Sequence, residues 1–214
     1  MGLVFGQGSS GGRSVTTRCN MVNGVATNKL IVCTVGHSTR SLGVFAALLK
    51  SNDIGFVLDV RTVPRSRHNP QFNHDSLPDF LNTVDVHYEH FPLLGGLRKT
   101  RVNSPNTGWR NLSFRGYADY MQTPEFEEGV EQVIELAIRE RCVLMCAEAV
   151  PWRCHRSLIA DALTVRGVQV EDIITAKGRR PHLLTSWAKV DRLCITYPAE
   201  TAGNAPPASE STNS

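Results

Sequence analysis

The sequence predicts an α/β protein with three layers, in which a mostly parallel central sheet is flanked by helices. Apolar runs of strand length alternate with segments of helical periodicity along most of the chain, an order that favours parallel strands joined by crossover helices. The chain has 214 residues, of which 41% are hydrophobic and 20% charged, so it can bury a substantial core within one domain.

The first three elements follow the order strand, helix, strand. Residues 30–35, LIVCTV, form a continuous apolar run that predicts a buried strand, and the sequence GHS at 36–38 predicts a turn after it. Ser41 then precedes a segment whose apolar residues recur with helical spacing. Residues 54–60, IGFVLDV, predict the second buried strand.

The rest of the chain continues the alternation. The later elements are predicted as a helix over 76–83, a strand over 86–91, a helix from Thr123-Pro124, a strand over 142–145, a helix over 154–166 and a strand over 168–174. Threonine as N-cap and proline at the first helical position are typical of a helix start. The apolar face of that helix is predicted to comprise Phe126, Val130, Val133, Ile134, Ala137 and Ile138.

Both ends of the chain differ in composition from this central unit. Residues 1–28 are rich in Gly, Ser, Asn and Thr, and residues 199–214 in Ala, Pro, Ser and Thr, which predicts disordered tails around one domain over 29–198. Six cysteines without a CxxC pair, and no apolar run long enough to span a membrane, favour a cytoplasmic protein with no membrane partner. A net charge of +3 is too small to indicate nucleic-acid binding by itself.

Polar residues follow three of the predicted strands. His37 comes after the first strand, Asp59 and Arg61 after the second, and Cys146 and Glu148 after the fourth. Right-handed crossovers place the carboxyl ends of parallel strands at one edge of a sheet, where open α/β sheets bind their ligands. The sequence therefore predicts a pocket built from two segments, CAEAVPWRCHR at 146–156 and DVRTVPRSRH at 59–68.

The chain resembles the family known as domain of unknown function 488. The resemblance rests on TVGHSTRS at 34–41, LDVRTVPRSRHNPQFN at 58–73, LGG at 94–96, FRGYADYM at 114–121 and CAEAVPWRCHRSLIADAL at 146–163. It covers essentially the whole folded unit and implies an α/β architecture. It does not imply an established reaction.

We expect the catalytic groups to come from acids, imidazoles and thiols within this pocket. Proton transfer is assigned to Glu148 or Asp59, and ligand orientation or proton shuttling to His37 and His155. Cys146 or Cys154 could instead act as a nucleophile, since a thiolate is stabilised near a helix N-terminus. The structural alternatives are a salt bridge between Glu148 and Arg156 or Arg61, and a Cys154 that packs under the helix while His155 bonds a carbonyl.

Anion binding is assigned to Ser38, in the turn after the first strand, and to Arg61, Arg67 and Arg156 of the two segments. The alternative is that Asp59 pairs with Arg61 or Arg67 and braces a long loop. No metal site is expected, because the spacing of Cys146 and Cys154 fits no standard zinc signature and arginines flank them. Neither the dinucleotide-binding glycine pattern nor the P-loop is present, and no cofactor is indicated.

The favoured function is an enzyme that hydrolyses, or transfers a group from, a nucleotide-like, nucleobase-containing or phosphorylated small molecule. Two alternatives remain. The first is a nucleic-acid-binding or base-processing protein, because the segment 97–117, LRKTRVNSPNTGWRNLSFRGY, interleaves basic and aromatic residues that could contact nucleic acid. The same segment could instead form a loop over the site. The chain could also be a non-catalytic ligand-binding domain.

Overall fold

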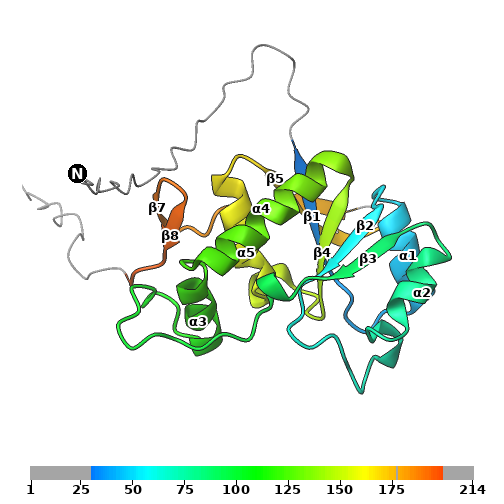
Figure 1. The fold of residues 1–214 in the computed structure, drawn as a ribbon, viewed down its shortest axis with the longest axis horizontal. Helices are drawn as coiled ribbons and strands as arrows, with labels where there is room; N and C mark the ends of the chain where they lie inside the picture. Colours follow the sequence, from blue (N-terminus) through cyan, green and yellow to red (C-terminus); the bar gives the residue numbers. More distant parts are fainter. Residues whose placement is uncertain (1–29, 177, 200–214) are drawn as a thin grey trace, which may run out of the picture.

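The computed structural model describes residues 30–176 and 178–199 (Figure 1). Its centre is a six-stranded sheet in the order β3-β2-β4-β1-β5-β6, in which the first five strands are parallel and β6 is antiparallel to β5. The strands are β1 (Ile31–Gly36), β2 (Phe56–Asp59), β3 (His87–His90), β4 (Cys142–Cys146), β5 (Gln169–Thr175) and β6 (Gly178–Pro181).

Five helices and a small second sheet complete the described part of the chain. The helices are α1 (Leu42–Lys50), α2 (Leu77–Asn82), α3 (Leu112–Tyr120), α4 (Pro124–Arg139) and α5 (Arg156–Val165). Strands β7 (Lys189–Asp191) and β8 (Cys194–Thr196) pair only with each other. None of the helices within these ranges is long and apolar enough to cross a membrane.

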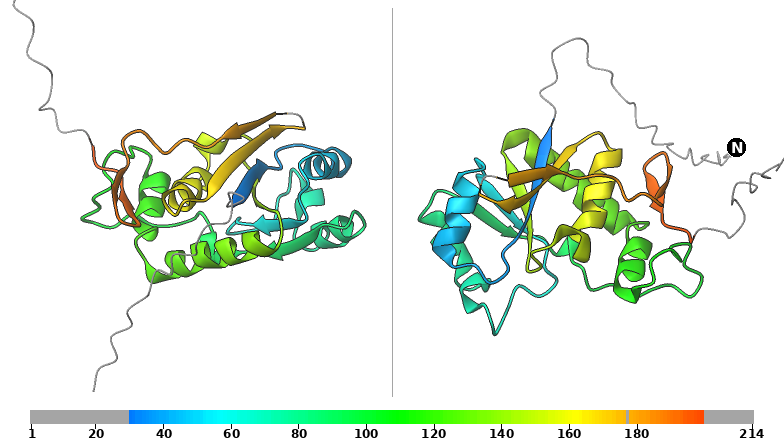
Figure 2. Two further views of the ribbon diagram at one scale, coloured as in Figure 1. Left: turned by 90° about the horizontal axis from the view of Figure 1, so that it is seen from above. Right: turned by 180° about the vertical axis from the view of Figure 1, so that it is seen from behind.

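The helices cover the two faces of the sheet separately, which confirms the predicted three-layer arrangement (Figure 2). On one face, Phe45 of α1 and Leu81 of α2 pack with sheet residues such as Val143. On the other face, Val130 of α4 and Ile159 of α5 pack with a second set of sheet residues. Burying apolar side chains on both faces is what the continuous apolar runs of the strands predicted.

The order of the strands creates a crevice at the carboxyl end of β4. The chain first moves outward from β1 to β2 and β3, then returns to insert β4 between β1 and β2 before crossing to β5. Because α1 and α5 leave β1 and β4 toward opposite faces, a switch point lies between these strands. Ligands bind at such points in open α/β sheets.

Local signals at the helix starts are confirmed. Ser41 caps α1 by accepting a hydrogen bond from the backbone N–H of Val44, and Thr123 caps α4 by accepting from Phe126, with Pro124 as the first helical residue. The predicted apolar face of α4 was wrong at one residue. Ile138 is 71% exposed, because it lies on the side of the helix away from the sheet.

Four elements were not predicted. Helix α3 lies in the segment that was expected to be a loop, and its start is capped by Asn111, whose side chain accepts from the next turn. Strands β6, β7 and β8 are three or four residues long, and β6 and β7 are mostly exposed, so none of the three contains a long apolar run. The last predicted helix begins at Arg156 rather than at residue 154, because a short 3₁₀ turn, Pro151–Arg153, precedes it. Apart from Ala199, the predicted tails lie outside the described residues.

Candidate functional site

A pocket of about 480 Å³ lies at the carboxyl edge of the sheet, where the sequence predicted one. The loop after β2, the loop before α3 and the turn between β4 and α5 all contribute to it. Its lining residues are Arg61, Thr62, Val63, Arg65, Ser66, Gly96, Leu97, Ser113, Phe114, Cys146, Ala147, Glu148, Arg153, Cys154 and His155.

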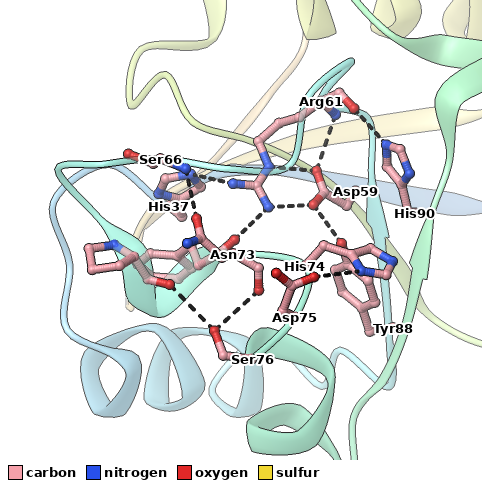
Figure 3. A network of polar contacts seen from close by, with 12 residues as sticks. His37, Asp59, Arg61, Ser66, Asn73, His74, Asp75, Ser76, Tyr88 and His90 are labelled. Atoms are coloured by element: carbon pink, nitrogen blue, oxygen red, sulfur yellow. Dashed lines mark hydrogen bonds and ion pairs between the residues drawn. The ribbon is translucent and has the colours of Figure 1, made fainter.

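Asp59 and Arg61 form a buried ion pair at the end of β2 (Figure 3). Asp59 Oδ1 accepts from the Arg61 backbone N–H and from Arg61 Nε at 2.8 Å, while Oδ2 accepts from Arg61 Nη2 and from the hydroxyl of Tyr88 at 2.7 Å. Arg61 Nη2 also donates to the carbonyl of Phe72 at 2.7 Å. Burial opposes the charge of Arg61, but the Asp59 carboxylate outweighs it and raises the Arg61 pKa. Every oxygen of Asp59 is therefore used within the protein.

His37 supports Arg61 rather than facing the pocket. Its ring stacks on Phe72 with centroids 4.2 Å apart, and Nε2 lies 3.3 Å from Arg61 Nη1. Because a guanidinium can only donate, Nε2 is the accepting nitrogen and Nδ1 carries the hydrogen that it donates to the carbonyl of Ser38 at 2.8 Å. Burial lowers the pKa of His37 to about 4, and the nearby charge of Arg61 acts in the same direction. His37 is therefore neutral at physiological pH.

Two thiols and an imidazole converge at the other side of the pocket. The sulfurs of Cys146 and Cys154 and a ring nitrogen of His155 all lie within 4.8 Å of one another. Cys146 ends β4, whereas Cys154 and His155 occupy the turn directly before α5. Cys154 Sγ is 3.6 Å from His155 Nδ1 and accepts from Arg156 Nε at 3.4 Å.

The His155 ring is held in one orientation. Its Nε2 lies 3.0 Å from the carbonyl oxygen of Val60, which can only accept, so Nε2 carries the hydrogen and Nδ1 presents a lone pair. A Cβ on Gly96 would lie 2.5 Å from Nδ1 and 2.8 Å from both neighbouring ring carbons. These distances place the Gly96 backbone over the face of the ring, and Tyr117 packs nearby at 5.0 Å between centroids.

The pKa values of the two thiols are shifted in opposite directions. A hydrogen bond from Cys146 has the largest effect on Cys154; burial opposes it and the charge of Arg156 reinforces it, so the pKa of Cys154 lies well below its usual value. The same hydrogen bond, together with burial, raises the pKa of Cys146. The two shifts are opposite because two bare thiolates so close together in a buried site repel each other.

Arg156 lies beneath the pocket. Its side chain is 1% exposed, and its guanidinium donates to Cys154 Sγ, to Thr34 Oγ1 and to the backbone carbonyl of Glu148. Thr34 in turn donates to Asp172 at 2.6 Å. Arg156 therefore connects the turn before α5 with β1 and β5.

The carboxylate of Glu148 is exposed, and its recorded hydrogen bond is a 3.3 Å contact from the backbone N–H of Val150. The backbone at Glu148, by contrast, is fixed. A Cβ on Gly36 would collide with the Glu148 carbonyl, so glycine is required where β1 ends against this turn. Glu148 therefore combines a fixed backbone with an exposed carboxylate in a residue that lines the pocket.

Of the ten residues predicted for the site, five line the pocket: Arg61, Cys146, Glu148, Cys154 and His155. The other five are placed around it without lining it. Asp59, His37 and Arg156 are buried, Arg67 is exposed on the loop after β2, and Ser38 occupies a turn with φ of 52°. The roles assigned to all ten stay predictions.

Sequence reasoning missed the apolar part of the lining, which comes from Val63, Leu97 and Phe114. Val63 and Leu97 are exposed apolar residues in loops, at 59% and 74% exposure. The sequence could have indicated them through their neighbours, because Val63 lies in the loop after β2 and Leu97 follows the LGG motif at 94–96.

Comparison with known families supports the relationship indicated by the motifs. The family model described as domain of unknown function DUF488 matches residues 41–163, which is more than half of the chain. The chain belongs to the DUF488 family. The DUF488 match includes both pocket segments from Asp59 to His155, and it begins after the turn that contains His37. No curated protein and no solved structure gave a match.

The aromatic residues of the segment 97–117 are engaged within the protein. Trp109 stacks on Phe114 at 4.8 Å and contacts Trp187 and Tyr197, while Tyr117 is buried and donates to the carbonyl of Leu94. Tyr117 therefore belongs to the core, and Phe114 packs against it. Phe114 still contributes to the lining of the pocket.

Proposed function

We propose that this DUF488 protein is an enzyme that binds a small anionic ligand at the carboxyl edge of the sheet and acts on it by hydrolysis or group transfer. The observation that carries this proposal is one pocket that combines Cys146, Cys154 and His155 with the free carboxylate of Glu148. Such a mixture of thiols, an imidazole and an acid serves reaction chemistry better than packing.

The lining favours a nucleotide-like or nucleobase-containing ligand. Arg65 and Arg153 are exposed guanidiniums that can bind phosphate or another anion, while Val63, Leu97 and Phe114 offer apolar surface for a planar ring. The volume of about 480 Å³ falls in the range of small-molecule sites, which is about 300–1,000 Å³. Arg61 contributes its remaining donor from the buried pair.

Glu148 is the group best placed to move a proton. Its exposed carboxylate is attached to a fixed backbone at the pocket, and among the described residues Glu148 forms no ion pair. A carboxylate so placed can accept a proton from an attacking water or hydroxyl. The alternative is attack by Cys154, whose sulfur lies beside both His155 Nδ1 and Arg156 Nε.

The test combines binding with turnover. Melting temperatures are measured against nucleosides, nucleotides, free bases and inorganic phosphate, and each stabilising compound is then incubated with the enzyme and its products identified by mass spectrometry. Glu148→Gln should keep the binding shift and lose most turnover, whereas Glu131→Gln, an exposed acid on α4, should change neither. A ligand that binds without any product under these conditions would support the non-catalytic alternative instead.

A second candidate is nucleic-acid binding, favoured by three exposed basic residues of the segment 97–117, Lys99, Arg101 and Arg110. Affinity for single strands or duplexes should then fall steeply with salt, and Lys99→Gln with Arg101→Gln should flatten the slope. Absence of binding at low salt would exclude this candidate.

A further inference from the structure

The cluster of Cys146, Cys154 and His155 has dimensions suited to a metal ion. Around a tetrahedral zinc ion, a sulfur and a nitrogen ligand lie about 3.6 Å apart, given bond lengths of about 2.3 and 2.0–2.1 Å. Cys154 Sγ and His155 Nδ1 are already 3.6 Å apart, and all three candidate ligand atoms lie within 4.8 Å of one another. Small side-chain adjustments would bring Cys146 Sγ into the same shell.

The protonation of His155 is also the one that metal binding requires. Its Nε2–H donates to the Val60 carbonyl, so the lone pair of Nδ1 is directed at the sulfurs. Metal-binding histidines almost always donate their other ring N–H to a carbonyl, carboxylate or water, which fixes both ring and tautomer. A Cβ built on Gly96 would lie above the ring face at Nδ1, since it would be almost as near to the two flanking carbons as to Nδ1 itself, and Gly96 therefore leaves the in-plane lone pair open.

The surrounding charges are compatible with a divalent cation. Zinc binding deprotonates both thiols, which places two negative charges in a largely buried position, and Glu148 adds a third at the pocket. Arg156 contributes one buried positive charge through its 3.4 Å hydrogen bond to Cys154 Sγ, and Arg61 is neutralised by Asp59. A divalent ion would bring this group to zero, while Arg153 is exposed to solvent and therefore screened.

We propose that Cys146, Cys154 and His155 bind one zinc ion, with the fourth coordination position open to the pocket. Thiolate and imidazole ligands favour zinc over magnesium or calcium. Three protein ligands with an open fourth position are typical of catalytic rather than structural zinc sites. In the reaction proposed above, the ion would lower the pKa of a bound water near the Glu148 carboxylate. Metal binding itself does not depend on that reaction.

The sequence spacing argued against this site, because Cys146 and Cys154 are eight positions apart. The turn between β4 and α5 removes that objection. It contains a 3₁₀ turn, Pro151–Arg153, that returns the chain so that Cys154 lies beside the end of β4. Adjacent ligands such as Cys154 and His155 can also converge, since they lie before the helix rather than within it.

Cobalt provides the direct test. The full-length protein is stripped with a chelator and titrated with Co²⁺, and we expect one equivalent to give intense visible bands of a tetrahedral site together with sulfur-to-cobalt absorption in the near ultraviolet. Zn²⁺ should displace it. Cys146→Ser, Cys154→Ser and His155→Gln should each weaken binding by at least about 100-fold, beyond the 10–100-fold typical of outer-shell changes. Cys194→Ser should leave affinity unchanged.

A second measurement keeps the test decisive if a variant unfolds. The unaltered protein is alkylated with and without one equivalent of Zn²⁺, and each modified cysteine is identified by mass spectrometry. Zinc should protect Cys146 and Cys154 together while Cys194, exposed on β8, reacts equally in both samples. Rapid labelling of Cys154 despite zinc, or no tetrahedral cobalt spectrum from folded protein, would overturn the metal site. Loss of turnover in Glu148→Gln with normal cobalt binding would concern the proposed reaction alone.

Discussion

The ends of β2 and β4 lie side by side at one edge of the sheet, yet their acidic side chains are bonded to different degrees. Asp59, after β2, is fully buried and accepts four hydrogen bonds from Arg61 and Tyr88. Glu148, after β4, is exposed and accepts one from Val150. A carboxylate with every lone pair engaged stabilises the fold, whereas one with free lone pairs can act on a ligand. We therefore assign structural support to the half of the site after β2 and, under the proposed function, chemistry to the half after β4.

The largest expected effect comes from breaking the supporting half. Arg61→Leu leaves Asp59 buried without its partner, and we expect a loss of about 3–5 kcal/mol in the free energy of unfolding, measured by urea denaturation. Arg65→Leu is the matched control, since its ion pair with Asp75 is exposed and should contribute no more than about 1 kcal/mol. Equal losses in both variants would contradict the assignment of Asp59 and Arg61 to structural support.

A pH-dependent effect should arise at His182. Burial acts to lower its pKa, but a hydrogen bond to Asp161 at 2.8 Å and the carboxylate of Asp172, 3.9 Å from the ring, outweigh burial and raise the pKa to about 9. A raised pKa gives stability that is complete below about 6.5 and is lost as the pH rises through about 9. We expect roughly 2 to 3 kcal/mol to disappear over this window.

The comparison for this prediction is His182→Gln, which cannot titrate. The difference in unfolding free energy between the two proteins, measured from pH 6 to 9.5, should narrow as the pH rises. A constant difference would mean that His182 is neutral in the folded protein.

Gly96 offers a smaller change that acts on the chemical half. A Cβ there would meet the His155 ring at 2.5 Å, so Gly96→Ala should destabilise the protein by roughly 1–3 kcal/mol and weaken cobalt binding. Gly43, in α1, has open space around it, and Gly43→Ala should be neutral or stabilise by no more than about 1 kcal/mol. Retention of full cobalt affinity in Gly96→Ala would show that the ring does not depend on this contact.

The smallest effect on stability is expected at Glu148. Glu148→Gln should change the unfolding free energy by less than about 0.5 kcal/mol, because the side chain is exposed and glutamine can still accept from Val150. Denaturation and turnover measured on the same preparation provide the check. A large loss of unfolding free energy in this variant would show that Glu148 contributes to structural support, as Asp59 does.

The sequence predicted the parallel sheet because its strands are buried on both faces and therefore appear as apolar runs. It could not predict β6, whose residues GRRP are mostly exposed, since an edge strand need not be apolar. The strand-end rule located the pocket at Cys146 and Glu148. The rule could not predict the direction of a side chain. The order of residues in the sequence does not show that Arg156 extends beneath the turn to Thr34.

Convergence of Cys154 and His155 on Cys146 was also hidden from the sequence. A spacing rule assumes that ligands come from a known turn or helix, and here the ligand set depends on how the 3₁₀ turn Pro151–Arg153 folds back. The tautomer of His155 depends in turn on the carbonyl of Val60, which is distant along the chain and carries no side-chain signal.

The contact between Gly36 and the Glu148 carbonyl has a consequence for how a ligand is admitted. That carbonyl is held from one side by the backbone of β1 and from the other by the guanidinium of Arg156. The turn after β4 therefore has little freedom to swing as a gate, and the geometry of the pocket is set before anything enters. Association should then lose little conformational entropy in this turn, and discrimination between ligands should depend on their fit to a shape that already exists.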